Sequence, residues 1–202
     1  MTPDFFALLD EPRRPWLEPD SLKKKFLSLS AEVHPDRVHT SGEAAKEEAS
    51  KRFAELNAAY NCLREPKERL RHLLELELGN KPSDLHQIPS DLANLFMDIA
   101  GMCRQADAFL GEYAAVSSPL LRAQMFERGQ EWTERLMSMQ KQVGQRHDTA
   151  IARLKELDAQ WTAEVTARRE LIPQLADVWR LLGFFTRWTA QIQERLAQIA
   201  VQ

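Results

Sequence analysis

The sequence predicts an all-α protein, and three observations support this prediction. Only 7 of the 202 residues are glycine, too few for the many turns of a β-sandwich or barrel. Apolar residues recur three and four positions apart over most of the chain, which is the spacing of one helix face. Proline and glycine stand mostly between these periodic stretches, where they end one helix or begin the next.

The composition argues against several functional classes. The 27 Lys and Arg residues and 30 Asp and Glu residues give a net charge of -3, so we expect no general attraction to nucleic acid or to a membrane surface. The longest apolar runs are far too short to cross a bilayer. The N-terminus has the character of neither a signal peptide nor a transit peptide. The two cysteines form no C-x-x-C pair, and we expect a soluble, cytoplasmic protein.

Residues 1–79 predict a compact module of four helices. Pro19 and Pro66 suit the first position of a helix, whereas Pro35 disfavours helical geometry at the residue before it. Gly79 ends the last of the four helices, because glycine readily adopts the left-handed conformation found at helix ends. The expected helices cover residues 5–9, 19–33, 43–63 and 66–78.

Residues 80–89 predict a connector, and residues 90–202 predict a second helical domain. Ser90 suits the N-cap of a helix whose apolar stripe runs from Leu92 to Leu110. The break at Ser117-Ser118-Pro119 then separates this helix from the rest of the chain.

The last 80 or so residues predict a long antiparallel hairpin. Two apolar seams, at 121–157 and 171–199, advance by steps of three and four as in a coiled coil. A reversal near Asp158 to Thr162 gives two arms of almost equal length, which suit packing against the helix that begins at Ser90. The result is a three-helix bundle. Pro173 predicts either a kink or a turn placed later than this.

The tripeptide His34-Pro35-Asp36 lies between two amphipathic helices. By itself it is a weak signal, because it also serves as a plain helix stop. Its surroundings make it specific, and with them the sequence resembles a J domain, the module that stimulates ATP hydrolysis by DnaK-type chaperones. The matching pieces are Asp4-Phe5-Phe6, Arg37 after the tripeptide, Phe53-x-x-x-Asn57-x-Ala59-Tyr60-x-x-Leu63 and Pro66-x-x-Arg69-x-x-x-Leu73-Leu74.

The last of these pieces, followed by a connector and a three-helix domain, is similar to the HscB branch of J-domain proteins. This resemblance implies a co-chaperone that stimulates a DnaK/HscA-type chaperone and delivers to it the scaffold protein of iron–sulfur cluster assembly. The basic cluster Lys23-Lys24-Lys25 lies near the start of the helix expected at residues 19–33. In general J domains the basic residues lie nearer the end of this helix, and the difference suggests a dedicated HscA-like partner. The implied chaperone-binding residues are His34, Pro35, Asp36, Arg37, Lys23, Lys24 and Lys25.

Two further segments are similar to the parts of HscB proteins that meet the scaffold. They are Leu95-Phe96-Met97-Asp98 and Arg180-x-Leu182-x-Phe184-Phe185-x-Arg187. The implied scaffold-binding residues are Phe96, Met97, Asp98 and Phe184. Phe and Met at helical spacing are equally typical of a buried core, and Ala100, Gly101 and Cys103 stand where the family usually has larger or charged residues.

No arrangement of residues predicts catalysis, a cofactor or a metal site. The five histidines do not pair at metal-ligand spacings, and no glycine-rich phosphate loop is present. We therefore expect neither an enzyme nor a metalloprotein. Two alternatives remain open for the function. One is a J-domain co-chaperone with a different client or a dimerising hairpin, and the other is a coiled-coil protein whose J domain does not stimulate a chaperone.

Overall fold

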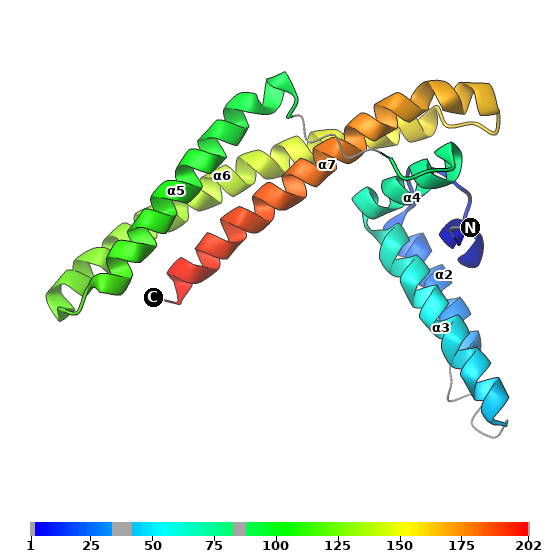
Figure 1. The fold of residues 1–202 in the computed structure, drawn as a ribbon, viewed down its shortest axis with the longest axis horizontal. Coiled ribbons are helices and arrows are strands. Elements are labelled where there is room, and N and C mark those ends of the chain that lie inside the picture. Colours follow the sequence, from blue (N-terminus) through cyan, green and yellow to red (C-terminus); the bar gives the residue numbers. More distant parts are fainter. Residues whose placement is uncertain (1–2, 34–41, 83–87, 202) are drawn as a thin grey trace. The chain divides into compact units, whose positions relative to one another are not determined.

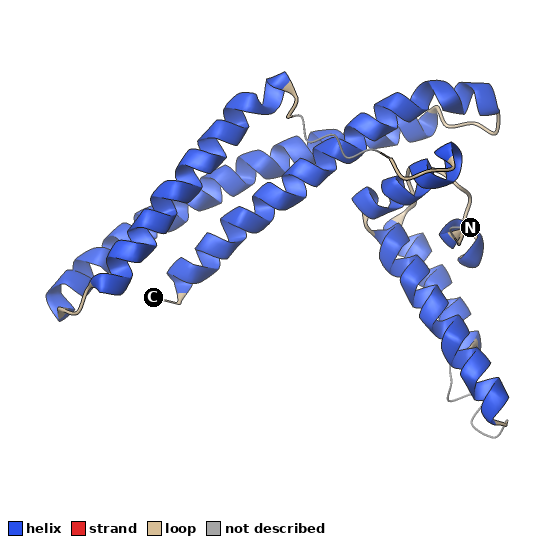
Figure 2. Ribbon diagram, viewed as in Figure 1, coloured by secondary structure: helices blue, strands red, loops and turns tan. Residues whose placement is uncertain are grey.

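The structure, a computed structural model, describes residues 3–33, 42–82 and 88–201. Within these ranges the chain forms seven α-helices, a short 3-10 helix and no strand (Figure 2). The all-α prediction is confirmed. The elements are α1 (Phe5–Leu8), α2 (Pro19–Glu32), α3 (Glu43–Arg64), α4 (Pro66–Leu78), η2 (Ser90–Leu92), α5 (Ala93–Ala115), α6 (Pro119–Ala159) and α7 (Val165–Ala200). Figure 1 labels α2 to α7.

Contacts between residues group the chain into two compact units. The N-terminal unit contains Met1–Ser83 together with Ile151–Arg180. The bundle unit contains Asp84–Ala150 together with Leu181–Gln202. The two long helices α6 and α7 therefore each contribute residues to both units, and each unit is described by itself below.

In the N-terminal unit, α3 packs against α1, α2 and α4. Proline occupies the first position of both α2 and α4, as predicted. Asp4 caps α1, because its Oδ1 accepts hydrogen bonds from the backbone N–H groups of Phe6 and Ala7. Gly79 ends α4 in the left-handed conformation. The core consists of Phe6, Leu9, Leu17, Leu22, Leu56, Ala59, Leu63 and Leu73.

The bundle unit is the three-helix arrangement that the sequence predicts. Phe109 of α5 lies beside Trp132 of α6, with ring centroids 6.3 Å apart. Arg195 of α7 donates to Asp107 of α5 at 2.8 Å. Gly129 of α6 lies where the three helices meet, since a Cβ atom there would be 3.7 Å from both Phe109 and Ile199.

The hairpin also forms as expected, and its turn lies between the end of α6 at Ala159 and the start of α7 at Val165. Pro173 does not mark a turn, because it lies inside α7. It lies on the exposed side of that helix, where water can bond the carbonyl group that loses its helical partner. No helix in the described ranges is both long enough and apolar enough to span a membrane.

Candidate functional site

The predicted chaperone-binding motif, His34 to Arg37, lies outside the described residues, but the helices on either side of it are described. α2 ends at Glu32 and α3 begins at Glu43. The two helices pack against each other. Their contact includes Phe26 and Tyr60, whose rings stack with centroids 4.3 Å apart. The motif therefore connects two helices that are held together by their own side chains.

The three predicted lysines of α2 have two different environments. Lys23 and Lys24 are exposed. Lys25 is partly covered, because its Nζ donates to the carbonyl oxygen of Asp10. The same Nζ lies 3.4 Å from Oδ2 of Asp10 and 3.5 Å from Oε1 of Glu11. Lys23 and Lys24 thus present charge to solvent, whereas Lys25 holds the loop that precedes α2.

The predicted scaffold-binding residues of α5 form an exposed patch. Met97 is 61% exposed, Asp98 is exposed and Phe96 is partly buried. The Phe96 ring lies beside Trp188 of α7, with centroids 6.3 Å apart. A thioether and an aromatic edge next to a carboxylate suit contact with an apolar surface of another protein.

Phe184 differs from these residues because it is only 6% exposed. Its ring lies 5.7 Å from that of Trp188, and the Arg187 guanidinium lies 4.9 Å from the centroid of the Phe184 ring. Phe184 of α7 and Phe96 of α5 therefore both contact Trp188. Phe184 is buried beneath the surface, and Phe96 lies at the surface. Sequence reasoning missed Trp188, although it stands one helical turn after Phe184.

The small residues that follow the patch on α5 differ in exposure. Cys103 is buried, whereas nothing lies within 4 Å of the position that a Cβ atom would take at Gly101. The surface of α5 therefore has open space at Gly101, into which a larger side chain would project.

Both cysteines are free and buried. Burial raises the pKa of Cys62 to about 11 and also raises the pKa of Cys103. Both thiols are therefore protonated at neutral pH, and a protonated thiol is a poor metal ligand. Within the described ranges, no group of three or more His, Cys, Asp or Glu side chains is placed to hold a metal ion.

Comparison with known families defines the class of protein first. Residues 4–72 match the family model of the DnaJ domain. This span runs from the capping residue of α1 into α4 and includes the His34-Pro35-Asp36 tripeptide. The protein is therefore a J-domain protein.

Individual relatives narrow the class. The chain is 30% identical over 132 residues to the co-chaperone protein HscB homolog of Bordetella avium, and the match covers 61% of this chain and 78% of that relative. The chain belongs to the HscB co-chaperone family. Matches to the HscB homologs of Chromobacterium violaceum and Paraburkholderia phymatum are 37% identical, but they span only 51% and 41% of those relatives.

Two solved structures share the fold. Chaperone HscB from Vibrio cholerae has a TM-score of 0.57 at 19% identity, covering 95% of this chain and 96% of that one. The crystal structure of human co-chaperone protein HscB has a TM-score of 0.55 at 17% identity, covering 95% of this chain and 81% of that one. At these identities the likeness concerns the fold alone, an N-terminal J domain and a C-terminal helical bundle.

Proposed function

We propose that this protein stimulates the ATPase of a DnaK/HscA-type chaperone and delivers to it the scaffold protein of iron–sulfur cluster assembly. The observation that carries the proposal is the Bordetella avium match. It is longer than the J domain alone, and the relative is named as an HscB co-chaperone. In this proposal residues 1–79 are the J domain, 80–89 the connector and 90–202 the scaffold-binding domain, and the protein acts in the cytoplasm by binding rather than by catalysis.

The chaperone-binding side comprises His34 to Arg37, between α2 and α3 in the sequence, and the lysines of α2. Proline restricts its own backbone angle φ, while the side chains of His34 and Asp36 supply directional hydrogen bonds in the complex. Such contacts speed hydrolysis only if they favour the hydrolysis-competent state of the chaperone over its resting state. The exposed Lys23 and Lys24 suit steering toward an acidic surface, which raises the association rate more than the affinity.

The scaffold-binding side comprises Phe96, Met97 and Asp98 on α5. Phe184 supports it through Trp188, because the burial of Phe184 leaves little of its surface for a partner. A chain that holds the scaffold at one site and the chaperone at another raises the effective concentration of the scaffold at the chaperone.

The experiment is steady-state ATP hydrolysis by a DnaK-type chaperone with this protein, with and without the iron–sulfur scaffold. We expect stimulation that the scaffold increases further, and we expect His34→Gln to abolish it. His147→Gln, on α6 in the bundle unit, is the matched control and should retain full stimulation.

Other outcomes contradict separate parts of the proposal. Stimulation that is indifferent to the scaffold would leave a J-domain co-chaperone with a different client. No stimulation by the wild-type chain would favour a protein whose J domain does not act on a chaperone.

A further inference from the structure

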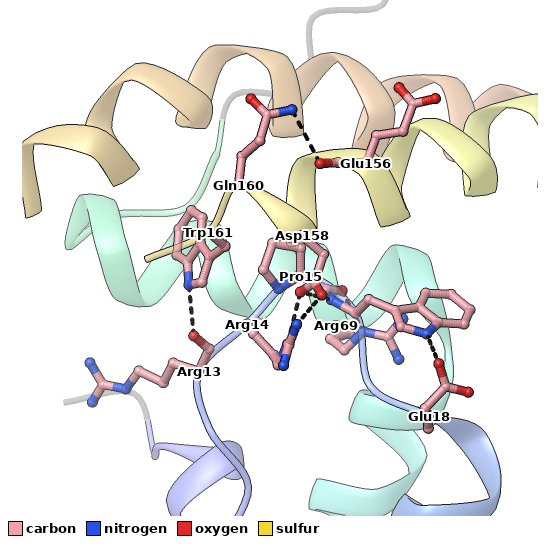
Figure 3. Close-up of polar contacts among 10 residues, drawn as sticks. Arg13, Arg14, Pro15, Glu18, Arg69, Glu156, Asp158, Gln160 and Trp161 are labelled. Atoms are coloured by element: carbon pink, nitrogen blue, oxygen red, sulfur yellow. Dashed lines mark hydrogen bonds and ion pairs between the residues drawn. The ribbon is translucent and has the colours of Figure 1, made fainter. Parts of the chain in front are cut away.

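The loop between α1 and α2 is held by the tip of the helical hairpin (Figure 3). We call residues 10–18 the strap and residues 151–168 the hairpin tip, and both belong to the N-terminal unit. The strongest contact is made by Asp158, near the end of α6, which is 6% exposed. Its Oδ1 accepts from Nε of Arg14 at 3.0 Å and from the backbone N–H of Trp16 at 2.9 Å. Its Oδ2 accepts from Nη2 of Arg14.

Further contacts fasten the strap on either side of this carboxylate. The Nε1 of Trp161 donates to the carbonyl oxygen of Arg13 at 2.8 Å, as Figure 3 shows. The Nζ of Lys155 lies 4.4 Å from the centroid of the Trp16 ring. Side chains 144 and 148 residues away in the sequence thus hold the middle of the strap in place.

A buried arginine of α4 also donates a hydrogen bond to the strap. Arg69 is 2% exposed. Its Nε donates to the carbonyl oxygen of Pro15 at 2.8 Å, and its Nη1 donates to that of Leu63 at 2.7 Å. Its Nη2 is buried and has no hydrogen-bond partner within the described residues. Together with the contacts above, every residue from Arg13 to Trp16 is bonded to Arg69 or to the hairpin tip.

Asp158 also gives the largest electrostatic support to this buried charge. Burial lowers the pKa of Arg69 to about 10, and the carboxylate of Asp158 acts against that fall more than any other group does. The same carboxylate raises the pKa of Arg14. A buried guanidinium is costly without a nearby anion. One residue of the hairpin tip therefore stabilises two arginines of the N-terminal segment.

The two ends of the strap lead to the part of α2 that carries the lysines. At one end Asp10 and Glu11 hold Lys25, as described above. At the other end Nε1 of Trp16 donates to Oε1 of Glu18 at 2.7 Å, and Glu18 is the N-cap residue of α2. Leu17 between them is buried in the core. The backbone position of the strap thus determines where the first turns of α2 lie.

We propose that Asp158 is a positioning residue for chaperone stimulation: by anchoring the strap to the hairpin tip, it holds the first turns of α2 in the arrangement that the chaperone meets. This inference rests on the proposed function. It adds to that function a dependence of the J domain on a residue of α6 that stands 144 positions after Arg14 in the sequence.

The test is Asp158→Asn in the full-length protein, measured as chaperone ATPase over a range of co-chaperone concentrations. The concentration for half-maximal stimulation should rise roughly threefold to tenfold, the range expected when a binding surface must be ordered on association. The rate at saturation should stay unchanged. Asp148→Asn makes the same charge change on an exposed side chain of α6 and should behave as wild type.

Hydrogen exchange separates positioning from a general loss of stability. In Asp158→Asn, amides of residues 13–25 should exchange faster, while those of α5 should not change. Arg14→Gln removes only the Arg14 contacts, and Arg14 is partly exposed, so that variant should fold and move in the same direction by a smaller amount. Asp158→Glu keeps the charge and should restore part of the loss.

An unchanged half-maximal concentration in both Asp158→Asn and Arg14→Gln would overturn the inference. So would an equal rise in Asp148→Asn. If the wild-type chain stimulates no chaperone, the proposed function fails instead. Unaltered exchange at residues 13–25 in Asp158→Asn would then still refute the anchoring role of Asp158.

Discussion

At the scale of single residues, His72 shows how burial changes the role of a titratable group. His72 lies on α4 and is buried. Its Nε2 accepts a hydrogen bond from the backbone N–H of Phe5 at 3.1 Å. Its ring lies 4.7 Å from the ring of Phe5 and 5.7 Å from that of Phe6. A neutral imidazole with an acceptor nitrogen fits this environment, and a protonated one does not.

The first prediction concerns the pH dependence of stability. Burial lowers the pKa of His72, with Asp4 and Glu75 acting weakly against it. Because the unfolded state then binds a proton more readily than the folded state, the contribution of His72 is present above the unfolded pKa of about 6.5 and is lost as the pH falls below it. We expect the urea concentration at the unfolding midpoint to be lower at pH 5.5 than at pH 7.5.

His72→Gln should reduce that difference between the two pH values, because the amide does not titrate. It should also cost about 1–2 kcal/mol at pH 7.5 through poorer hydrogen bonding and packing. His147→Gln, which removes a partly exposed histidine of α6, serves as the control for replacing an imidazole by an amide. If the urea midpoint changes between the two pH values by the same amount in His72→Gln as in the wild type, groups other than His72 account for the change.

At the scale of elements, local signals in the sequence predicted the helices well. Pro19, Pro66 and Gly79 mark helix boundaries because their backbone preferences act within one turn. The hairpin turn followed from the lengths of two apolar seams. The strap could not be found in this way, since Arg14 and Asp158 are 144 residues apart. Helical spacing also could not separate Met97, which is exposed, from Phe184, which is buried.

The exposed face of α5 leads to a prediction about the scaffold. Phe96→Ala combined with Met97→Ala should weaken scaffold binding by about tenfold or more, because exposed apolar anchors dominate most protein interfaces. Stimulation of the chaperone without scaffold should not change. Isothermal titration calorimetry with the purified scaffold measures the first effect, and the ATPase assay measures the second.

Met137→Ala is the matched control, since Met137 is also an exposed methionine, but on α6. It should bind the scaffold as wild type does. Phe184→Ala should instead lower the stability by about 3–5 kcal/mol, as for a buried aromatic residue. Unaltered affinity in the double variant would remove the α5 patch from the proposed function.

At the scale of the whole molecule, the apolar seam of α7 is packed against other residues of the same chain. Its members from Leu171 to Ile192 are buried by other parts of the same chain, apart from the polar member Thr189, which is partly buried. A dimeric coiled coil needs an apolar seam that stays available over several heptads. The exposed large apolar residues of α6 lie in its first half, and they do not repeat at the three- and four-residue spacing of such a seam. They are Leu120, Leu121, Phe126 and Met137.

We therefore expect the protein to be monomeric at micromolar concentration, with a mass near 23.3 kDa in sedimentation equilibrium. A mass twice as large would support the alternative of a dimerising hairpin. In that case Leu121→Glu, at the start of α6, distinguishes two kinds of dimer. If that substitution returns the protein to a monomer, the exposed start of α6 is the interface. If it does not, the seam must open to pair with a second chain, and the buried packing of α7 within one chain is wrong. Neither kind of dimer is needed for the proposed function, because the proposed scaffold-binding and chaperone-binding sites lie on one chain.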